Sequence, residues 1–168
     1  HACFELQSDF TLVIDPHDGR SLGLSPPSAS ADLVLVSHDH FDHNDADAIS
    51  GNPTILRGPG VFTLDDLKIT GIFGLHSGNS GRRGMKNTIF VIDINGVRVC
   101  HIGDNRHDMP ESVREQIGDV DMLMVTVDDS SHLLTPEEAD QLITRLSHSV
   151  VIPMHYYIPK ITTEESEL

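Results

Sequence analysis

The chain has 168 residues, with 26 Asp and Glu against 11 Lys and Arg, so its formal net charge is −15 with histidine neutral. This length fits one compact domain, and we expect a single domain over residues 1–168. So acidic a chain repels phosphate backbones and anionic lipid, which excludes nucleic acid and membrane surfaces as expected partners. The 11 histidines are the unusual feature, because imidazole binds metals and carries protons near neutral pH.

The start of the chain, its cysteines and its hydropathy add further expectations. The first residue is His1 rather than Met, so we expect that the beginning of the domain is missing from this sequence. Cys3 and Cys100 stand in apolar, strand-like contexts and are expected to be buried thiols, not a disulfide. No stretch approaches the ~18 apolar residues that a membrane helix requires. We expect a cytoplasmic protein, for which assembly into a homo-oligomer stays open.

The first half of the chain predicts short strands joined by loops. β-branched, aromatic or continuous apolar residues indicate strands at 2–6, 10–14, 33–36, 54–56 and 67–75. Acidic residues ahead of Gly51 predict a short helix at 44–49. Segments rich in Gly, Pro or Ser predict loops at 16–31 and 77–86.

The second half predicts a hairpin and then alternating helices and strands. Asn95-Gly96 indicates a tight turn between strands at 88–94 and 97–102, because both turn positions need positive φ. Further elements are expected in the order helix, strand, helix, strand, at 110–117, 121–127, 135–146 and 150–152. Two mixed sheets packed together with helices outside would accommodate this pattern.

A dense group of histidines and aspartates follows the apolar strand at 33–36, in Ser37-His38-Asp39-His40-Phe41-Asp42-His43. These side chains would repel one another if protonated and are costly to bury without a cation. The alternate residues His38 and His40 can point the same way to hold one ion, while Asp42 and His43 can address a second. Mixed nitrogen and oxygen donors suit Zn²⁺, Mn²⁺ or Fe²⁺ better than Ca²⁺.

Five segments in chain order resemble the motifs of the metallo-β-lactamase superfamily. They are Val13-Ile14-Asp15-Pro16, His38-x-His40-x-Asp42-His43, His76, His101-Ile102-Gly103-Asp104 and Ile152-Pro153-Met154-His155-Tyr156. The resemblance implies a four-layer αββα sandwich that holds two divalent ions. Zinc is the expected metal, with manganese or iron as alternatives. It implies that the first metal is held by His38, His40 and His76. It implies that the second is held by Asp42, His43 and His155, with Asp104 bridging both.

The resemblance also implies a hydrolytic mechanism. A water shared between two cations loses a proton near neutral pH and becomes the nucleophile, while the cations polarise the attacked carbonyl or phosphoryl group. Asp42 or Asp104 is the expected acceptor of the nucleophile's proton. Asp15 is expected to orient a metal ligand through a hydrogen bond, and His1 to flank the metals. The expected substrate is a small ester-like molecule: a lactone, thioester or phosphodiester.

Within the superfamily, the chain most resembles the small stand-alone hydrolases related to L-ascorbate-6-phosphate lactonase. The likeness rests on His1-Ala2-Cys3-Phe4, Ile14-Asp15-Pro16 and Pro153-Met154-His155-Tyr156. The cations expected to clamp a phosphate or carboxylate of the substrate are Arg82, Arg83 and Lys86. His107 and His132 are further candidates for substrate contact, and His132 also for protonation of the leaving group.

Two functions of other classes stay open. One is a metal-binding or regulatory module that keeps the fold without turnover, which the presence of every expected ligand disfavours. The other is an iron-dependent redox enzyme. His40 argues against it, because the flavodiiron oxidoreductases carry Glu at that place in the motif.

Overall fold

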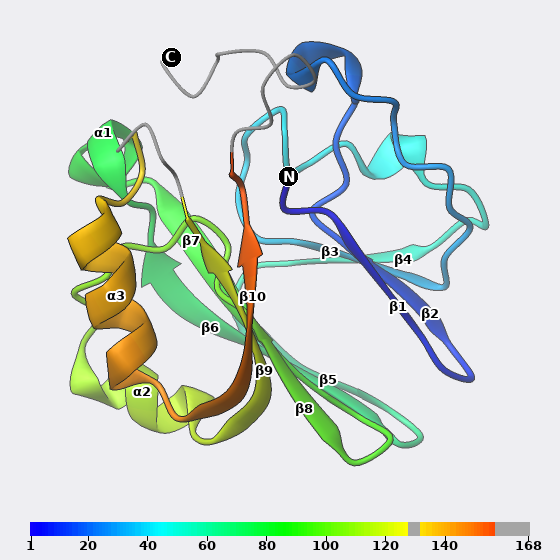
Figure 1. Cartoon of the computed structure of the whole chain (residues 1–168). Helices are drawn as coiled ribbons and strands as arrows, with labels where there is room; N and C mark the ends of the chain where they lie inside the picture. The colour runs from blue at the N-terminus through cyan, green and yellow to red at the C-terminus, as the bar shows by residue number, and fades with distance from the viewer. Residues whose placement is uncertain (128–131, 157–168) are drawn as a thin grey trace.

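The computed structural model describes residues 1–127 and 132–156, and in these its strands form two mixed sheets (Figure 1). The smaller sheet has the order β1-β2-β3-β4 and consists of β1 (Phe4–Gln7), β2 (Thr11–Ile14), β3 (Leu33–Val36) and β4 (Thr54–Arg57). The larger sheet has the order β10-β9-β8-β7-β6-β5 and consists of β5 (Gly60–Leu64), β6 (Leu67–Leu75), β7 (Lys86–Ile94), β8 (Val97–His101), β9 (Val120–Thr126) and β10 (His148–Met154).

The main core lies between the two sheets. β3 shows how it forms, because successive side chains of a strand point to opposite faces. Leu33 and Leu35 join the core shared with the larger sheet, while Val34 and Val36 pack into a second cluster on the other face of the smaller sheet. All four side chains are buried. The expectation of a strand covered on both faces is therefore confirmed.

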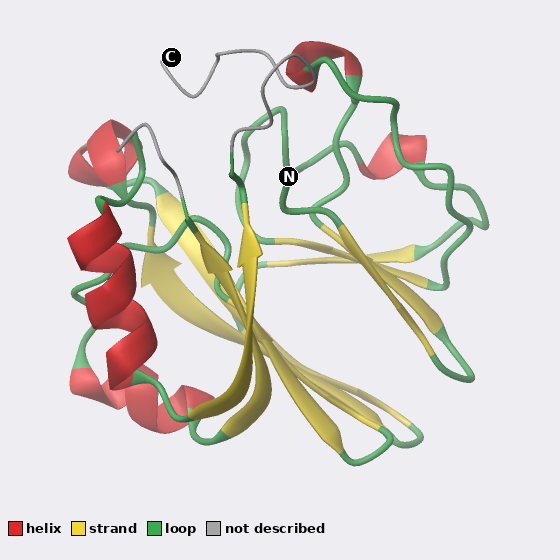
Figure 2. Cartoon of the chain, viewed as in Figure 1, coloured by secondary structure: helices red, strands yellow, loops and turns green. Residues whose placement is uncertain are grey.

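Helices cover the outer face of the larger sheet. Figure 2 shows α2 (Glu111–Ile117) and α3 (Pro136–Arg145) on that side, with α1 (Gly78–Arg82) near one end of the sheet. Thr135 caps α3, because its hydroxyl accepts a hydrogen bond from the Glu138 amide and the Glu138 side chain accepts one from the Thr135 amide. In the described parts of the chain, no helix is long and apolar enough to cross a membrane.

The outer face of the smaller sheet carries short 3₁₀ turns, η1 (Arg20–Leu22) and η2 (Ala46–Ala48). The expected helix at 44–49 was wrong in type, since only one such turn forms there. Its first buried residue, Ala46, and Ile49 just after it pack onto the outer side of β3. The expected fold of two mixed sheets with helices outside is confirmed, with loops and 3₁₀ turns forming much of one outer layer (Figure 2).

Two expectations on local structure were wrong. The loop expected at 77–86 contains α1, which packs tightly because Gly81 lies against the backbone of His76, where a Cβ atom would come within 1.6 Å of the carbonyl oxygen. The edge strand β5 was missed because most of its residues are exposed and show no clear apolar alternation. α1 also lies against the carbonyl of His132, far away in the sequence, through Gly78, and β5 forms by antiparallel pairing with β6.

The strand directions bring the motif residues to one end of the molecule. β2 runs parallel to β3, and β6, β8 and β10 all run in one direction within the larger sheet. Carboxyl ends of parallel strands meet at a common edge, where open α/β sheets place their sites. The residues that follow these strands are Asp15 after β2, Ser37 to His43 after β3, His76 after β6, Asp104 after β8 and His155 after β10.

Candidate metal centre

Asp104 lies at the centre of a cluster of imidazole rings. Its Oδ2 atom is 3.7 Å from Nε2 of His38 and 3.6 Å from Nε2 of His76. The same oxygen is 3.5 Å from Nε2 of His43 and 3.6 Å from Nε2 of His155. One buried carboxylate oxygen thus faces ring nitrogens from both expected ligand sets. This is the position that a ligand shared by two ions would need.

The potential ligand atoms around Asp104 fall into two groups, each with all its atoms within 4.8 Å of one another. The first group is His38, His40, His76 and Asp104. The second group is Asp42, His43, His155 and His1. These groups bring together the two ligand sets that the sequence predicts, and they place His1 beside the second.

The spacing within the first group suits two ligands of one ion. Nε2 of His38 and Nδ1 of His40 lie 3.2 Å apart. Two nitrogen ligands at the usual zinc distance in a tetrahedral site are separated by roughly 3.3 Å. The ring nitrogens are therefore already at a separation that a bound ion would require.

Within the two ligand groups, two buried ring nitrogens have no hydrogen-bond partner among residues 1–127 and 132–156: Nε2 of His43 and Nε2 of His76. The other nitrogen of each ring is engaged, because Nδ1 of His43 donates to Asp15 and Nδ1 of His76 donates to the Ser77 carbonyl, at 2.8 and 2.7 Å. A neutral imidazole that donates from Nδ1 presents an unprotonated Nε2. Both atoms thus fit metal ligands, and an ion would satisfy them.

Asp15 orients the metal-facing rings from behind. It is fully buried, and its carboxylate accepts hydrogen bonds from the Ser37 amide at 2.7 Å, the Ser37 hydroxyl at 2.5 Å and Nδ1 of His43 at 2.8 Å. The Ser37 oxygen lies 2.9 Å from Nδ1 of His38 and can accept its proton. One carboxylate thereby fixes a histidine in each group, directly and through Ser37. No sequence motif indicates this role for Ser37.

Two site residues adopt left-handed backbone conformations at strand ends. Asp15 has φ of 46° after β2, and His155 has φ of 66° after β10. Such conformations cost non-glycine residues about 1–3 kcal/mol and cluster at functional sites. At both positions the chain bends where the side chain reaches or supports the cluster. The surrounding hydrogen bonds and packing must supply the compensating stability.

Burial and the carboxylates together set the protonation of the cluster. Burial lowers the pKa of His38 to about 3, and the nearby charge of His43 adds to this effect. Burial also disfavours the charged form of His43, yet Asp104 and Asp42 raise its pKa well above the ordinary value. Burial would raise the pKa of Asp104, but the facing imidazoles of His155 and His43 hold it well below its usual range. The carboxylates are therefore ionised and ready to bind a cation.

Two further histidines lie next to the cluster. Nε2 of His1 donates to Oδ2 of Asp42 at 2.7 Å, and the His1 ring lies 3.9 Å from that of His155 between centroids. The fully buried His101 donates from Nε2 to the Ala2 carbonyl at 3.0 Å. His101 thus lies next to the cluster but belongs to neither ligand group.

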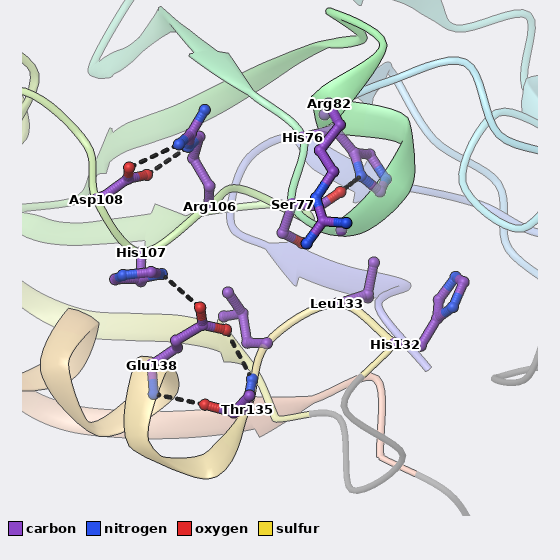
Figure 3. A pocket seen from close by; sticks show the side chains of 13 residues that line it. His76, Ser77, Arg82, Arg106, His107, Asp108, His132, Leu133, Thr135 and Glu138 are labelled. Atoms are coloured by element: carbon purple, nitrogen blue, oxygen red, sulfur yellow. Dashed lines mark hydrogen bonds and ion pairs between the residues drawn. The ribbon is translucent and has the colours of Figure 1, made fainter.

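A pocket of about 480 Å³ opens beside the first ligand group, with His76 and Ser77 in its wall (Figure 3). Of the predicted substrate residues, Arg82, His107 and His132 line it. Arg83 and Lys86 are exposed and do not belong to this lining. Three of the five predicted substrate residues therefore line the pocket and two do not.

Other residues of the pocket wall were not predicted from the sequence. Arg106 lines the pocket and donates two hydrogen bonds to the Asp108 carboxylate. Glu138 lies 3.3 Å from Nδ1 of His107 through its Oε1 atom. Arg106 stands in no recognisable motif, and Glu138 belongs to the capping box of α3, which indicates a helix start and not a pocket residue. Both residues line one pocket because the start of α3 lies opposite the loop after β8.

Known proteins with a similar sequence and fold identify the family to which this architecture belongs. A family model described as a β-lactamase superfamily domain matches residues 1–155. This chain belongs to the metallo-β-lactamase superfamily. A crystal structure from Thermotoga maritima, of a protein proposed to be a Zn-dependent hydrolase of this superfamily, matches with 34% identity and a TM-score of 0.77. The match covers 95% of the present chain and 74% of that protein.

Two other proteins extend the comparison. A UPF0173 metal-dependent hydrolase from Thermococcus onnurineus is 28% identical over 99% of this chain and 87% of its own length. An isothiocyanate hydrolase from Delia radicum gut bacteria is 13% identical, with a TM-score of 0.67 over 99% of this chain and 87% of that one. The second likeness shows the shared fold alone.

Proposed function

We propose that this superfamily member is a metal-dependent hydrolase that holds two divalent ions. Zinc is the expected metal, with manganese or iron as alternatives. One observation carries the proposal: Oδ2 of Asp104 lies 3.5–3.7 Å from ring nitrogens of both ligand groups. The first ion would be held by His38, His40 and His76, the second by Asp42, His43 and His155, and Asp104 would contact both. The similarity to the Thermococcus metal-dependent hydrolase supports this proposal.

The chain's own residues divide the work of hydrolysis. Two divalent ions would supply Lewis acidity, which makes a water nucleophilic and polarises the oxygen of the attacked group. Oδ2 of Asp42 or of Asp104 is the atom proposed to accept the proton of the attacking water. Asp42 is held for this role by His1, which donates to the same oxygen at 2.7 Å. His132, in the pocket wall, is proposed to protonate the leaving group.

The proposed substrates are small molecules with an ester-like bond: a lactone, a thioester or a phosphodiester. A pocket of about 480 Å³ is within the range of small-molecule sites. The net charge of −15 supports the exclusion of nucleic acid. The likeness to the L-ascorbate-6-phosphate lactonase branch, a cytoplasmic location and a homo-oligomeric state stay predictions from the sequence.

Metal analysis combined with a substrate panel tests the proposed function. We expect about two equivalents of metal per chain, hydrolysis of at least one chromogenic lactone, thioester, ester or phosphodiester, loss of this activity with a chelator and recovery with Zn²⁺. A protein filled with two ions of Zn²⁺ or Mn²⁺ that turns over no substrate would contradict the proposal and favour a non-catalytic module. Bound iron with electron transfer and no hydrolysis would favour a redox enzyme.

A further inference from the structure

The Ser77 side chain is a buried polar group in the wall of the pocket. Only 3% of its surface is exposed, and its hydroxyl has no hydrogen-bond partner within the described residues. Its backbone is held firmly, because its amide donates to the Asp104 carbonyl at 2.8 Å and its carbonyl accepts from His76 at 2.7 Å. Buried hydroxyls nearly always have a partner. The Ser77 hydroxyl is therefore available to a ligand in this pocket.

The Arg82 side chain offers a cation to the same space. Figure 3 shows its guanidinium directed from α1 past Ser77 into the pocket, whereas Arg106 turns toward Asp108. The Arg106 charge is neutralised by two hydrogen bonds to that carboxylate. Arg82 forms no ion pair with any residue in the described ranges. Its donors are therefore available for a carboxylate or a phosphate.

Two glycines place Ser77 and Arg82 against the pocket. A Cβ atom at Gly78, which has φ of 59°, would come within 2.5 Å of the His132 carbonyl. A Cβ atom at Gly81 would come within 1.6 Å of the His76 carbonyl. α1 can therefore lie against the His76 and His132 carbonyls only with glycine at these two positions. This packing fixes the start of α1 beside a metal ligand and its last residue, Arg82, at the pocket.

We propose that Ser77 Oγ and the Arg82 guanidinium bind an anionic oxygen group, a carboxylate or a phosphate, on the small substrate. This proposal rests on the function proposed above, which places the reacting bond next to His76. It adds the class of substrate, which is a small acid. A chain with net charge −15 repels anions over most of its surface. The Arg82 cation beside the cluster would therefore make this pocket the favoured place for an acid to bind.

Equilibrium binding tests this proposal without requiring turnover. The full chain, loaded with zinc, is titrated calorimetrically with succinate, with glycerol 3-phosphate and with neutral glycerol. The variants are Arg82→Gln and Ser77→Ala, and the matched control is Arg83→Gln, which removes the same charge from an exposed neighbour outside the pocket wall. We expect Arg82→Gln to weaken the binding of at least one anion about tenfold or more. Ser77→Ala is expected to weaken binding of the same anion several-fold. Arg83→Gln is expected to leave binding unchanged.

The pattern of losses decides the proposal. The anion that loses affinity in Arg82→Gln identifies the group as carboxylate, phosphate or either. Equal affinities in wild type and Arg82→Gln would overturn the proposal. Equal losses in Arg82→Gln and Arg83→Gln would also overturn it, because only net charge would then matter. Circular dichroism of each variant confirms that the fold is retained.

A kinetic comparison separates this proposal from the proposed function. Succinyl and butyryl thioesters of one chromogenic thiol differ by a carboxylate, and Arg82→Gln is expected to raise KM about tenfold for the acid alone. Equal KM values for the two thioesters in the wild type would refute the anion site and leave the hydrolase intact. A wild type that hydrolyses no panel substrate but binds anions through Arg82 would refute the hydrolase and leave the site intact.

Discussion

The metal cluster and the neighbouring pocket are built in different ways. Most of the cluster is buried, and it comes from the ends of strands in both sheets, with Asp104 at its centre. The pocket comes from α1, the loop after β8 and the start of α3, and its wall includes the exposed Arg82 and the half-buried His107 and His132. Sheets hold reacting groups rigidly, whereas loops vary without disturbing the core. The comparison suggests that the chemistry belongs to the sheets and the choice of substrate to the loops.

Removal of Asp104 should break the cluster and give the largest effect. Asp104→Ala is expected to abolish hydrolysis and to lose at least one metal, because four imidazoles then lack the carboxylate that they share. Metal content and activity are measured together. Asp108→Ala is the control, because it removes an exposed carboxylate from the pocket wall and should retain both ions. Two equivalents of metal in Asp104→Ala would show that the bridging role is wrong.

Removal of His132 tests the pocket side of the comparison. His132→Ala is expected to lower kcat about a hundredfold through loss of a proton donor, with metal content unchanged. His148→Ala is the matched control, since that ring lies on β10 and donates to the Leu146 carbonyl at 2.8 Å. A variant that keeps full kcat would remove His132 from the mechanism. One that loses metal would assign it to the cluster instead.

Asp15→Asn should weaken the cluster without dismantling it. The amide cannot accept all the hydrogen bonds from Ser37 and His43 that the carboxylate accepts, so metal affinity should fall roughly 10- to 100-fold. Competition with a chromogenic chelator measures the change. Asp18→Asn is the control, because among the described residues Asp18 accepts hydrogen bonds from Ser21 alone. Unchanged affinity would mean that ring orientation does not depend on Asp15.

Thr135→Ala should give the smallest effect and only on stability. The hydroxyl caps α3, and loss of such a cap costs about 1 kcal/mol. Thermal unfolding measures this loss, and Thr144→Ala, at an exposed position of α3, serves as the control. The two ligand groups lie elsewhere, so metal content should not change. A loss of metal in Thr135→Ala would show that the pocket and the cluster are not independent.

The cluster was largely predictable from the sequence, because its residues follow recognisable strands. His38, His40, Asp42 and His43 stand together after a continuous apolar run, and His76 and Asp104 end segments with strong strand patterns. The link that joins them was not predictable. Ser37 connects Asp15 to His38 through its hydroxyl, and a lone serine has no sequence pattern that would reveal this.

The pocket was only partly predictable, for a physical reason. In Gly81-Arg82-Arg83-Gly84 the two arginines look alike, and only the packing of α1 directs one of them into the pocket. That packing depends on a close contact between Gly81 and the His76 carbonyl. It depends also on the contact of Gly78 with the His132 carbonyl, far away in the sequence, so composition indicated a cationic loop without selecting the residue.

An anomalous-diffraction structure of the zinc-loaded chain tests the central claim most directly. We expect two metal peaks that share Asp104 as a ligand, one bound also by His38, His40 and His76 and the other by Asp42, His43 and His155. A single peak, or two peaks of which neither is bound by Asp104, would contradict the account.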